Sequence, residues 1–353
     1  MEQDKKNTRN QGIDLLRIIL IFMVCIQHVV TKADIMNTGT NPNAYVYWFI
    51  DMFCCCAVDS YAMISGYVSN KNTIQYKRIV SLWLQAIFYS FAVSLIMNLF
   101  FFKKELSLSF VIKSLMPITN NTFWYITAYI PLLFLMPFIN RHIDSLEDKE
   151  LKELFVVILY VFSFLALLGD SWSSYGYSCI WIVILYVIGR IIQKINLFKR
   201  LQSSSLLLLY LLSIAVTWLS FYITGIPRME EYISPTIMLC AMILVVVFSR
   251  IGMQNGSVRK ISALTLGIYL LQGNPYFSQF YFQKVLPLDG INLLPTLLLV
   301  FLKSLLLMMI GCAVEQARLL IFRILKIDKL ESVLSKILES IIDRLQVILE
   351  YLL

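Results

Sequence analysis

The chain has 353 residues, of which 59% are hydrophobic and 15% are charged, with a net charge of +8. A soluble domain carries about a quarter charged residues, so this composition excludes an ordinary soluble protein. The apolar residues form runs long enough to cross a bilayer as helices, whereas membrane strands would give short alternating segments. The basic residues lie in short loops between these runs, which argues against nucleic acid as a partner. We therefore expect an all-α membrane protein in contact with lipids.

About ten transmembrane helices are predicted. In chain order they cover residues 13–32, 46–68, 79–101, 121–139, 153–169, 178–195, 204–224, 233–249, 261–280 and 291–314. The segment 105–120 is moderately apolar but short, so we expect it to be re-entrant or interfacial rather than a further span. The first run is too long for a cleavable signal peptide and leads directly into further spans.

The distribution of loop charges predicts the orientation. Placing residues 1–12 in the cytoplasm puts most of the loop Lys and Arg on the cytoplasmic side, as the positive-inside rule requires. An even number of spans then returns the C-terminus to the same side. We assign residues 13–320 to the transmembrane domain and 321–353 to a cytoplasmic amphipathic helix, and we expect both termini to be cytoplasmic.

The C-terminal segment has a heptad-like apolar pattern from about residue 327 onward. The residues that carry it are Leu334, Leu338, Ile341, Leu345, Ile348 and Leu352. Such a stripe suits a helix on the inner membrane surface or against the bundle, and it also suits a coiled coil that would join copies into a homo-oligomer. Both alternatives remain open from the sequence.

The seven cysteines do not predict a metal site. All of them lie in or beside apolar segments, and the sequence has no CxxC motif or Cys/His cluster. Zinc sites need such clusters, so we expect the cysteines to act as small apolar side chains and expect no metal.

Charged or ionisable residues inside a membrane usually face a cavity or a partner. The first span carries Asp14, Arg17 and His28. Arg17 and His28 are eleven residues apart, which puts them on one helix face about 16 Å apart along the axis. Asp14 lies one turn before Arg17 on nearly the same face. This face is the strongest candidate for a functional surface.

The second span returns through the membrane with two acids, Asp51 and Asp59. Counted from the helix ends, Asp51 falls near the depth of His28, and Asp59 falls within about a turn of Arg17. If the two helices pack as a hairpin, an Asp51–His28 pair and an Arg17–carboxylate cluster are expected. An acid beside the imidazole would set its tautomer and raise its basicity, as a general base requires.

Five sequence motifs resemble the acyltransferase-3 family of membrane acyltransferases. They are GIDLLR at 12–17 followed by ten residues and His28, ISGY at 64–67, KRI at 77–79, FWY at 123–125 followed by Pro137, and LGIYLL at 266–271. The resemblance covers roughly residues 11–314 on the expected topology. It implies transfer of an acyl group, most often acetyl, from cytosolic acyl-CoA to a hydroxyl of a cell-surface or exported glycan or glycolipid, in a bacterial-type plasma membrane.

The resemblance also implies residue roles, with two departures. His28 takes the place of the family's essential histidine, and Arg17 that of its arginine. Many members have a second histidine where this chain has Gln272, so a mechanism with two histidines is excluded. Lys77 and Arg78 are adjacent rather than separated. No hydrolase-like domain follows the bundle, and we expect a stand-alone, polysaccharide O-acetyltransferase-like form.

A mechanism follows for the donor, acetyl-CoA or another acyl-CoA. Arg17, Lys77 and Arg78 are expected to bind its phosphates at the cytoplasmic surface, with the pantetheine arm threading along the helix face towards His28. His28 is then either a general base, with Asp51 as its partner, or an acyl carrier.

Four further residues are expected to contact the substrate. They are Asp59, Trp124, Tyr125 and Gln272. The two aromatic residues suit a sugar ring, although an interfacial aromatic belt is equally expected at their place.

Two other functions compete. A transporter or flippase for a glycan or small solute would use intramembrane Arg17 and Asp59 equally well, but no internal duplication is visible. A glycan polymerase or ligase would need large outer loops, and the longest here has around twenty residues. Turnover of a thioester would distinguish an acyltransferase from both.

Overall fold

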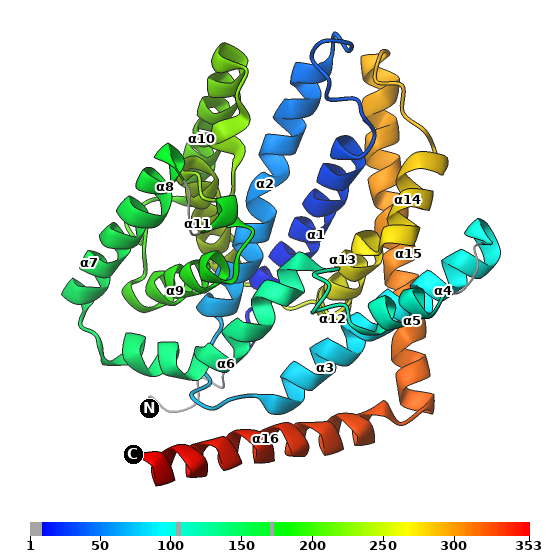
Figure 1. The fold of residues 1–353 in the computed structure, drawn as a ribbon. Helices are drawn as coiled ribbons and strands as arrows, with labels where there is room; N and C mark the ends of the chain where they lie inside the picture. The colour runs from blue at the N-terminus through cyan, green and yellow to red at the C-terminus, as the bar shows by residue number, and fades with distance from the viewer. Residues whose placement is uncertain (1–8, 104–106, 170–172) are drawn as a thin grey trace.

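The computed structural model describes residues 9–103, 107–169 and 173–353, and the regular structure in these parts is helical throughout. Eight helical segments among them are long and apolar enough to cross a membrane. Figure 1 shows them as a tilted bundle, with one further helix lying across the end that holds both termini. The chain is therefore an all-α membrane protein, as predicted.

The segments able to span are built from single helices and from joined ones. They are α1 (Gln11–Thr31), α2 (Ala44–Tyr67), α3 (Tyr76–Ile87) with η1 (Phe88–Val93), α4 (Ser94–Met97) and η2 (Asn98–Phe102), α6 (Trp124–Ser145), α7 (Asp148–Leu159) with η3 (Tyr160–Leu165) and α8 (Ala166–Leu168), α10 (Ser203–Thr224), η5 (Pro227–Glu230) leading to α11 (Pro235–Ser249), and α15 (Leu293–Ile324). The remaining helices are α5 (Leu108–Leu115), η4 (Ser174–Gly176), α9 (Cys179–Ile195), α12 (Gly256–Ser262), α13 (Thr265–Gly273), α14 (Pro275–Lys284) and α16 (Ile327–Leu352).

Two of the ten predicted spans are not among the described helices that are long and apolar enough to cross a membrane. The segment predicted at 178–195 is α9, whose 17 residues fall short of the roughly 20 that a full crossing needs. The single helix predicted over 261–280 is wrong, because the chain there is divided into α12, α13 and α14. Pro275 has no backbone N–H and disfavours a helical residue before it, so Asn274 is extended and ends α13.

The segment predicted to be re-entrant or interfacial contains α5. Its eight residues rise about 12 Å, too little to cross the apolar layer of a bilayer. The expectation that 105–120 does not span is therefore confirmed for its described part.

The last long helix continues further than predicted. α15 has 32 residues instead of ending near 314, and its final turns hold a buried ion pair between Glu315 and Arg318. The chain then turns at Lys326, in a left-handed conformation, into α16. The boundary assigned at 320/321 consequently falls inside α15. α16 lies across the end of the bundle beneath α3 (Figure 1), and Leu338 packs against the core.

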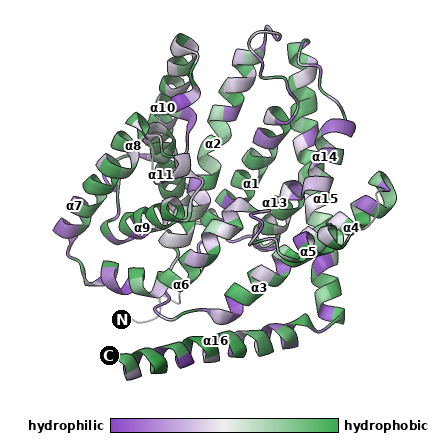
Figure 2. Ribbon diagram, viewed as in Figure 1, coloured by the Kyte–Doolittle hydropathy of each residue, from purple (hydrophilic) through white to green (hydrophobic). Residues whose placement is uncertain are grey.

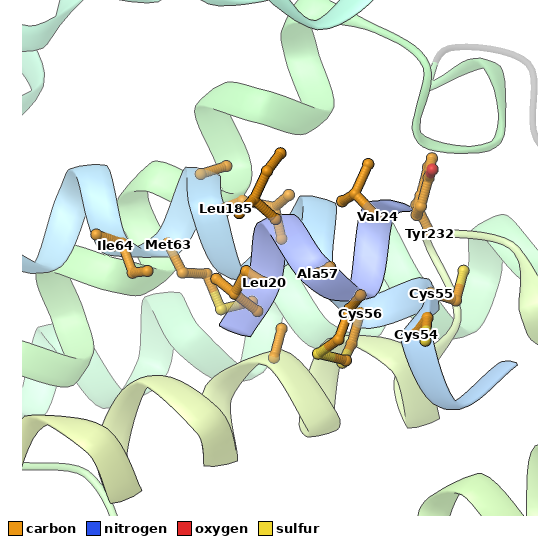
Figure 3. Packing of buried hydrophobic residues seen from close by; sticks show 14 of the residues in the cluster. Leu20, Val24, Cys54, Cys55, Cys56, Ala57, Met63, Ile64, Leu185 and Tyr232 are labelled. Carbon is orange, nitrogen blue, oxygen red and sulfur yellow. The ribbon is translucent and has the colours of Figure 1, made fainter. Parts of the chain in front are cut away.

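The centre of the bundle is formed by α1, α2, α9 and α11. Figure 3 shows Leu20 of α1 between Met63 and Ala57 of α2, with Leu185 of α9 close to them. By contrast, α7, α10 and α15 are largely hydrophobic along their lengths (Figure 2) and expose much of that surface. This pattern fits central helices surrounded by helices that face lipid.

The contact between α2 and α9 depends on two glycines. A Cβ at Gly66 would lie 2.0 Å from the carbonyl oxygen of Tyr186, and a Cβ at Gly189 would lie 2.1 Å from that of Met63. The absence of a side chain at each glycine therefore allows the backbone of the other helix to approach closely. In lipid, helices associate mainly through such close packing, because no aqueous hydrophobic effect drives them together.

Replacing Gly66 with Ala should destabilise the protein, since the added methyl group cannot fit without separating α2 from α9. Overpacking of this kind costs about 1–3 kcal/mol or more, and we expect a clear fall in the melting temperature in detergent. Gly256→Ala is the matched control, because nothing lies within 4 Å of a Cβ there. Equal melting temperatures for the two variants would contradict this packing.

Candidate active site

The start of α1 is held by a buried carboxylate. Asp14 is fully buried and accepts hydrogen bonds from Arg9, at 2.6 and 2.7 Å, from Arg17 at 2.7 Å and from Ser262 at 3.1 Å. Asn10 caps the helix by accepting from the N–H of Ile13 at 3.2 Å. A buried charge is tolerated when it is paired and hydrogen-bonded in this way. The network fixes both arginines at one end of the bundle.

Arg17 and His28 line one continuous cavity of about 990 Å³. It begins at Arg9 and Asn10, beside the start of α1, and follows the helix through Ile21 to His28. The helix face that the eleven-residue spacing predicted therefore forms part of the wall of this cavity. Arg17 retains 22% of its side-chain exposure despite its ion pair, so its guanidinium can still meet a ligand.

His28 is oriented by Gln272, the residue that stands where many members of the resembled family have a second histidine. Its Nδ1 lies 3.1 Å from the amide oxygen of Gln272, which is fully buried in the last turn of α13. Because an amide oxygen only accepts, Nδ1 carries the hydrogen and Nε2 is left with its lone pair. The ring of Phe282 meets the imidazole edge-on at 6.3 Å.

One turn further along, Lys32 marks the end of the α1 face. Its ammonium donates to the hydroxyl of Ser278 at 2.7 Å and lies 5.0 Å from the centre of the Phe282 ring. Desolvation at this place lowers the pKa of Lys32 from its usual range.

The expected pair between Asp51 and His28 does not form, so the assignment of Asp51 as the partner of the base is wrong. Asp51 is 1% exposed and lies instead against the side chains of Gln27 and Glu230. The depth along α2 was predicted correctly, since Gln27 precedes His28 directly. The rotation of α2, however, directs Asp51 to Gln27 and Glu230, and the imidazole is hydrogen-bonded to Gln272 instead.

Asp59 does not join the cluster around Arg17 either. It is fully buried and accepts a hydrogen bond from the indole Nε1 of Trp181 on α9 at 3.1 Å. Its side chain thus fastens α2 to α9 and does not line the cavity. The expected role of Asp59 in substrate contact is therefore not supported by its position.

The two basic residues at the start of α3 behave differently. Arg78 lines the cavity and donates to the hydroxyl of Tyr129 at 2.9 Å, which in turn donates to Ser65 at 3.1 Å. Lys77 is exposed and is not part of the cavity wall. Of the three expected phosphate ligands, Arg17 and Arg78 therefore share the cavity, and Lys77 lies outside it.

Trp124 and Tyr125 lie on the cavity wall. Tyr125 stacks on Tyr129 with ring centres 5.8 Å apart, and Trp124 stacks on Tyr232 at 5.9 Å. The structure thereby brings both aromatic residues to the same space as Arg17 and His28. Tyr232 was not expected, because it comes from the irregular segment before α11, where no periodic pattern marks a residue as buried.

Two further wall residues were missed from the sequence. Gln27 was passed over although it is adjacent to His28, because it falls about 100° away around the helix. Tyr61 donates to the backbone carbonyl of Arg17 at 2.5 Å, and a tyrosine in an apolar span gives no signal of such a contact. Both lie on the cavity wall.

Comparison with known families identifies the class of protein. The family model described as an acyltransferase domain matches residues 10–314, which is most of the chain and contains all of the cavity wall except Arg9. The chain therefore belongs to this acyltransferase family and is a membrane acyltransferase. No curated protein and no solved structure matched it.

The tautomer of His28 can be tested directly, because the chain has only two histidines. With ¹⁵N-histidine labelling, NMR should show His28 protonated at Nδ1 and unprotonated at Nε2. Gln272→Leu should allow the other tautomer, since the accepting oxygen is lost. The signals of the exposed His142, assigned with His142→Ala, should not change. An unchanged His28 tautomer in Gln272→Leu would contradict the orienting role of Gln272.

Proposed function

We propose that this acyltransferase moves an acyl group, by preference acetyl, from cytosolic acyl-CoA to a hydroxyl of a cell-surface or exported glycan or glycolipid. The observation that carries the proposal is the single cavity that joins Arg17 to His28. A charged end and an imidazole about 16 Å apart along one helix suit a ligand with an anionic head, a long arm and a reactive end. An acyl-CoA has that form.

The donor's phosphates are assigned to the end of the cavity that Arg17 lines. Arg9, Arg17 and Arg78 all line it, and guanidinium groups bind phosphate oxygens in bidentate fashion. Asp14 neutralises part of this charge, yet it faces Arg9 and Arg17 from the protein side and is itself fully buried. The arm would then run past Ile21 towards His28.

His28 is assigned to the chemistry as a general base. Its Nε2 lone pair removes the proton of the acceptor hydroxyl, the oxygen attacks the thioester carbon, and the bond to sulfur breaks. The imidazolium then returns its proton to the CoA thiolate, so the base is regenerated. A covalent acyl-histidine is the alternative. The hydrogen bond from Nδ1 to Gln272 favours the general base, because it fixes the ring for proton transfer.

The orientation follows from the same assignment. We propose a multi-pass protein of the plasma membrane with the Arg17 end of the bundle at the cytoplasmic surface, where acyl-CoA is available. α16 would lie along that surface, with its exposed residues Val333, Ile337, Ile341 and Ile348 meeting lipid. Its apolar stripe would equally serve contact with a second copy.

Replacing His28 with Ala should abolish acyl transfer while leaving the protein folded. General acid–base catalysis contributes about 10²- to 10⁴-fold, so release of CoA from acetyl-CoA by purified protein should fall at least about a hundredfold. His142→Ala is the control, because this exposed histidine lies away from the cavity. Retained turnover in His28→Ala, with an unchanged melting temperature, would end the assignment.

Replacing Arg17 with Gln should weaken the donor's nucleotide end specifically. Loss of one charged hydrogen bond is expected to raise the KM for acetyl-CoA about tenfold, whereas the KM for acetyl-pantetheine, which lacks the nucleotide, should change little. Lys77→Gln is the control, since Lys77 is basic but outside the cavity. An equal effect on the two donors would show that Arg17 does not read the phosphates.

A further inference from the structure

A second, smaller cavity of about 160 Å³ adjoins the His28 end of the large one. Its wall consists of Gln27, Trp48, Cys55, Tyr177, Pro227, Glu230, Glu231 and Tyr232. Gln27 and Tyr232 line both cavities, so the partition between them is a single layer of side chains. Figure 3 shows Tyr232 beside Cys55 and Val24, where α1 and α2 pass each other.

Aromatic rings form much of this partition. Tyr177 and Tyr232 have ring centres 5.0 Å apart, and Trp124 contacts Tyr177 at 4.7 Å and stacks on Tyr232. Trp48 lines the cavity from α2. Small-molecule sites are typically walled by aromatic side chains with a few polar groups that fix orientation. The apolar face of a single sugar ring suits such a wall, and the volume limits the occupant to a group of about that size.

One carboxyl oxygen of the cavity wall, Glu230 Oε2, has no hydrogen-bond partner among the described residues. Glu230 lines the cavity, and Asp51, 1% exposed, lies against Glu230 and Gln27 directly behind the wall. Among the described residues, neither Asp51 Oδ1 nor Glu230 Oε2 has a hydrogen-bond donor. Buried polar atoms are nearly always satisfied, and a ligand hydroxyl in the small cavity would satisfy Glu230, which Asp51 contacts from behind the wall.

We infer that the small cavity is the acceptor subsite, and that it takes a sugar without an anionic group through the hydroxyl groups of one ring. The inference rests on the proposed function and adds to it the place and the charge of the acceptor. A ring held between Trp48 and Tyr232 would present a hydroxyl beside Gln27, the neighbour of His28. The acceptor would thus reach the imidazole from the side opposite to the donor's arm.

The charge of the site sets its selectivity. Two acids, Glu230 and Glu231, line the cavity and, among the described residues, no lysine or arginine does, so an anionic group bound there would lose its hydration without gaining a cationic partner. A uronic acid or a phosphorylated sugar is therefore excluded. A neutral sugar meets no such barrier, because its hydroxyls donate to the carboxyl oxygens without bringing a charge of their own.

The test uses the full-length protein in lipid nanodiscs with labelled acetyl-CoA and two soluble acceptors. These are methyl glucoside and methyl glucuronide. The neutral glycoside should be the better acceptor, with kcat/KM at least about tenfold above that of the glucuronide, a difference of about 1.4 kcal/mol. Asp51→Asn and Glu230→Gln should each raise the KM for methyl glucoside about tenfold.

The same two variants should raise the KM for the acceptor far more than the KM for acetyl-CoA, and they should reduce the discrimination against the glucuronide. A general structural defect would change neither the ratio of the two KM values nor the discrimination against the glucuronide. Melting temperatures show whether each variant is folded. Asp34→Asn is the matched control, because Asp34 is an exposed acid after α1 that lies outside both cavities.

Three results would overturn the inference: an acceptor KM within about twofold of wild type in both variants, a glucuronide used as well as the neutral glycoside, or no glycoside acetylated at all. The proposed function fails separately, if CoA release does not depend on His28. Dependence on His28 together with silent Asp51 and Glu230 variants would remove the acceptor subsite alone.

Discussion

The close approach of α2 and α9 is the constraint on which the rest of the structure depends. Gly66 and Gly189 each receive a backbone carbonyl of the opposite helix, and in lipid such contacts replace the hydrophobic effect as the source of association. Once α2 is seated on α9, its rotation is set, and Asp59 reaches Trp181. Asp51, eight residues earlier, is thereby carried to Gln27 and Glu230. The position of both acids is thus a consequence of packing.

Against this fixed frame, α1 supplies the functional surface. Its first turn is held by the carboxylate of Asp14, and its last turns place His28 on the large cavity and Gln27 on both cavities. The break at Pro275 matters equally, because it ends α13 where Gln272 can meet the imidazole. In a single continuous helix, α14 would continue the direction of α13 and the chain would not bend beside His28. Local backbone chemistry and the site are therefore linked.

The sequence predicts features that lie within one helix better than features that depend on how two helices pack against each other. The shared face of Arg17 and His28 follows from the period of a single helix, and the structure places both on one cavity. The partners of Asp51 and Asp59 could not be predicted, because counting residues gives the depth of a side chain but not the rotation of its helix. Glu230 and Tyr232 lie in an irregular connection, where hydrophobic periodicity carries no information.

The wall shared by the two cavities has a thermodynamic consequence. Any ligand that shifts or orders Tyr232 or Gln27 in one cavity alters the other, because the same side chains face both. Linkage makes this coupling reciprocal, so the factor by which one substrate changes the affinity of its partner is the same in either direction. If the first ligand bears the entropic cost of ordering the wall, the second binds more tightly. A partition that includes these two side chains would thereby couple binding in one cavity to binding in the other.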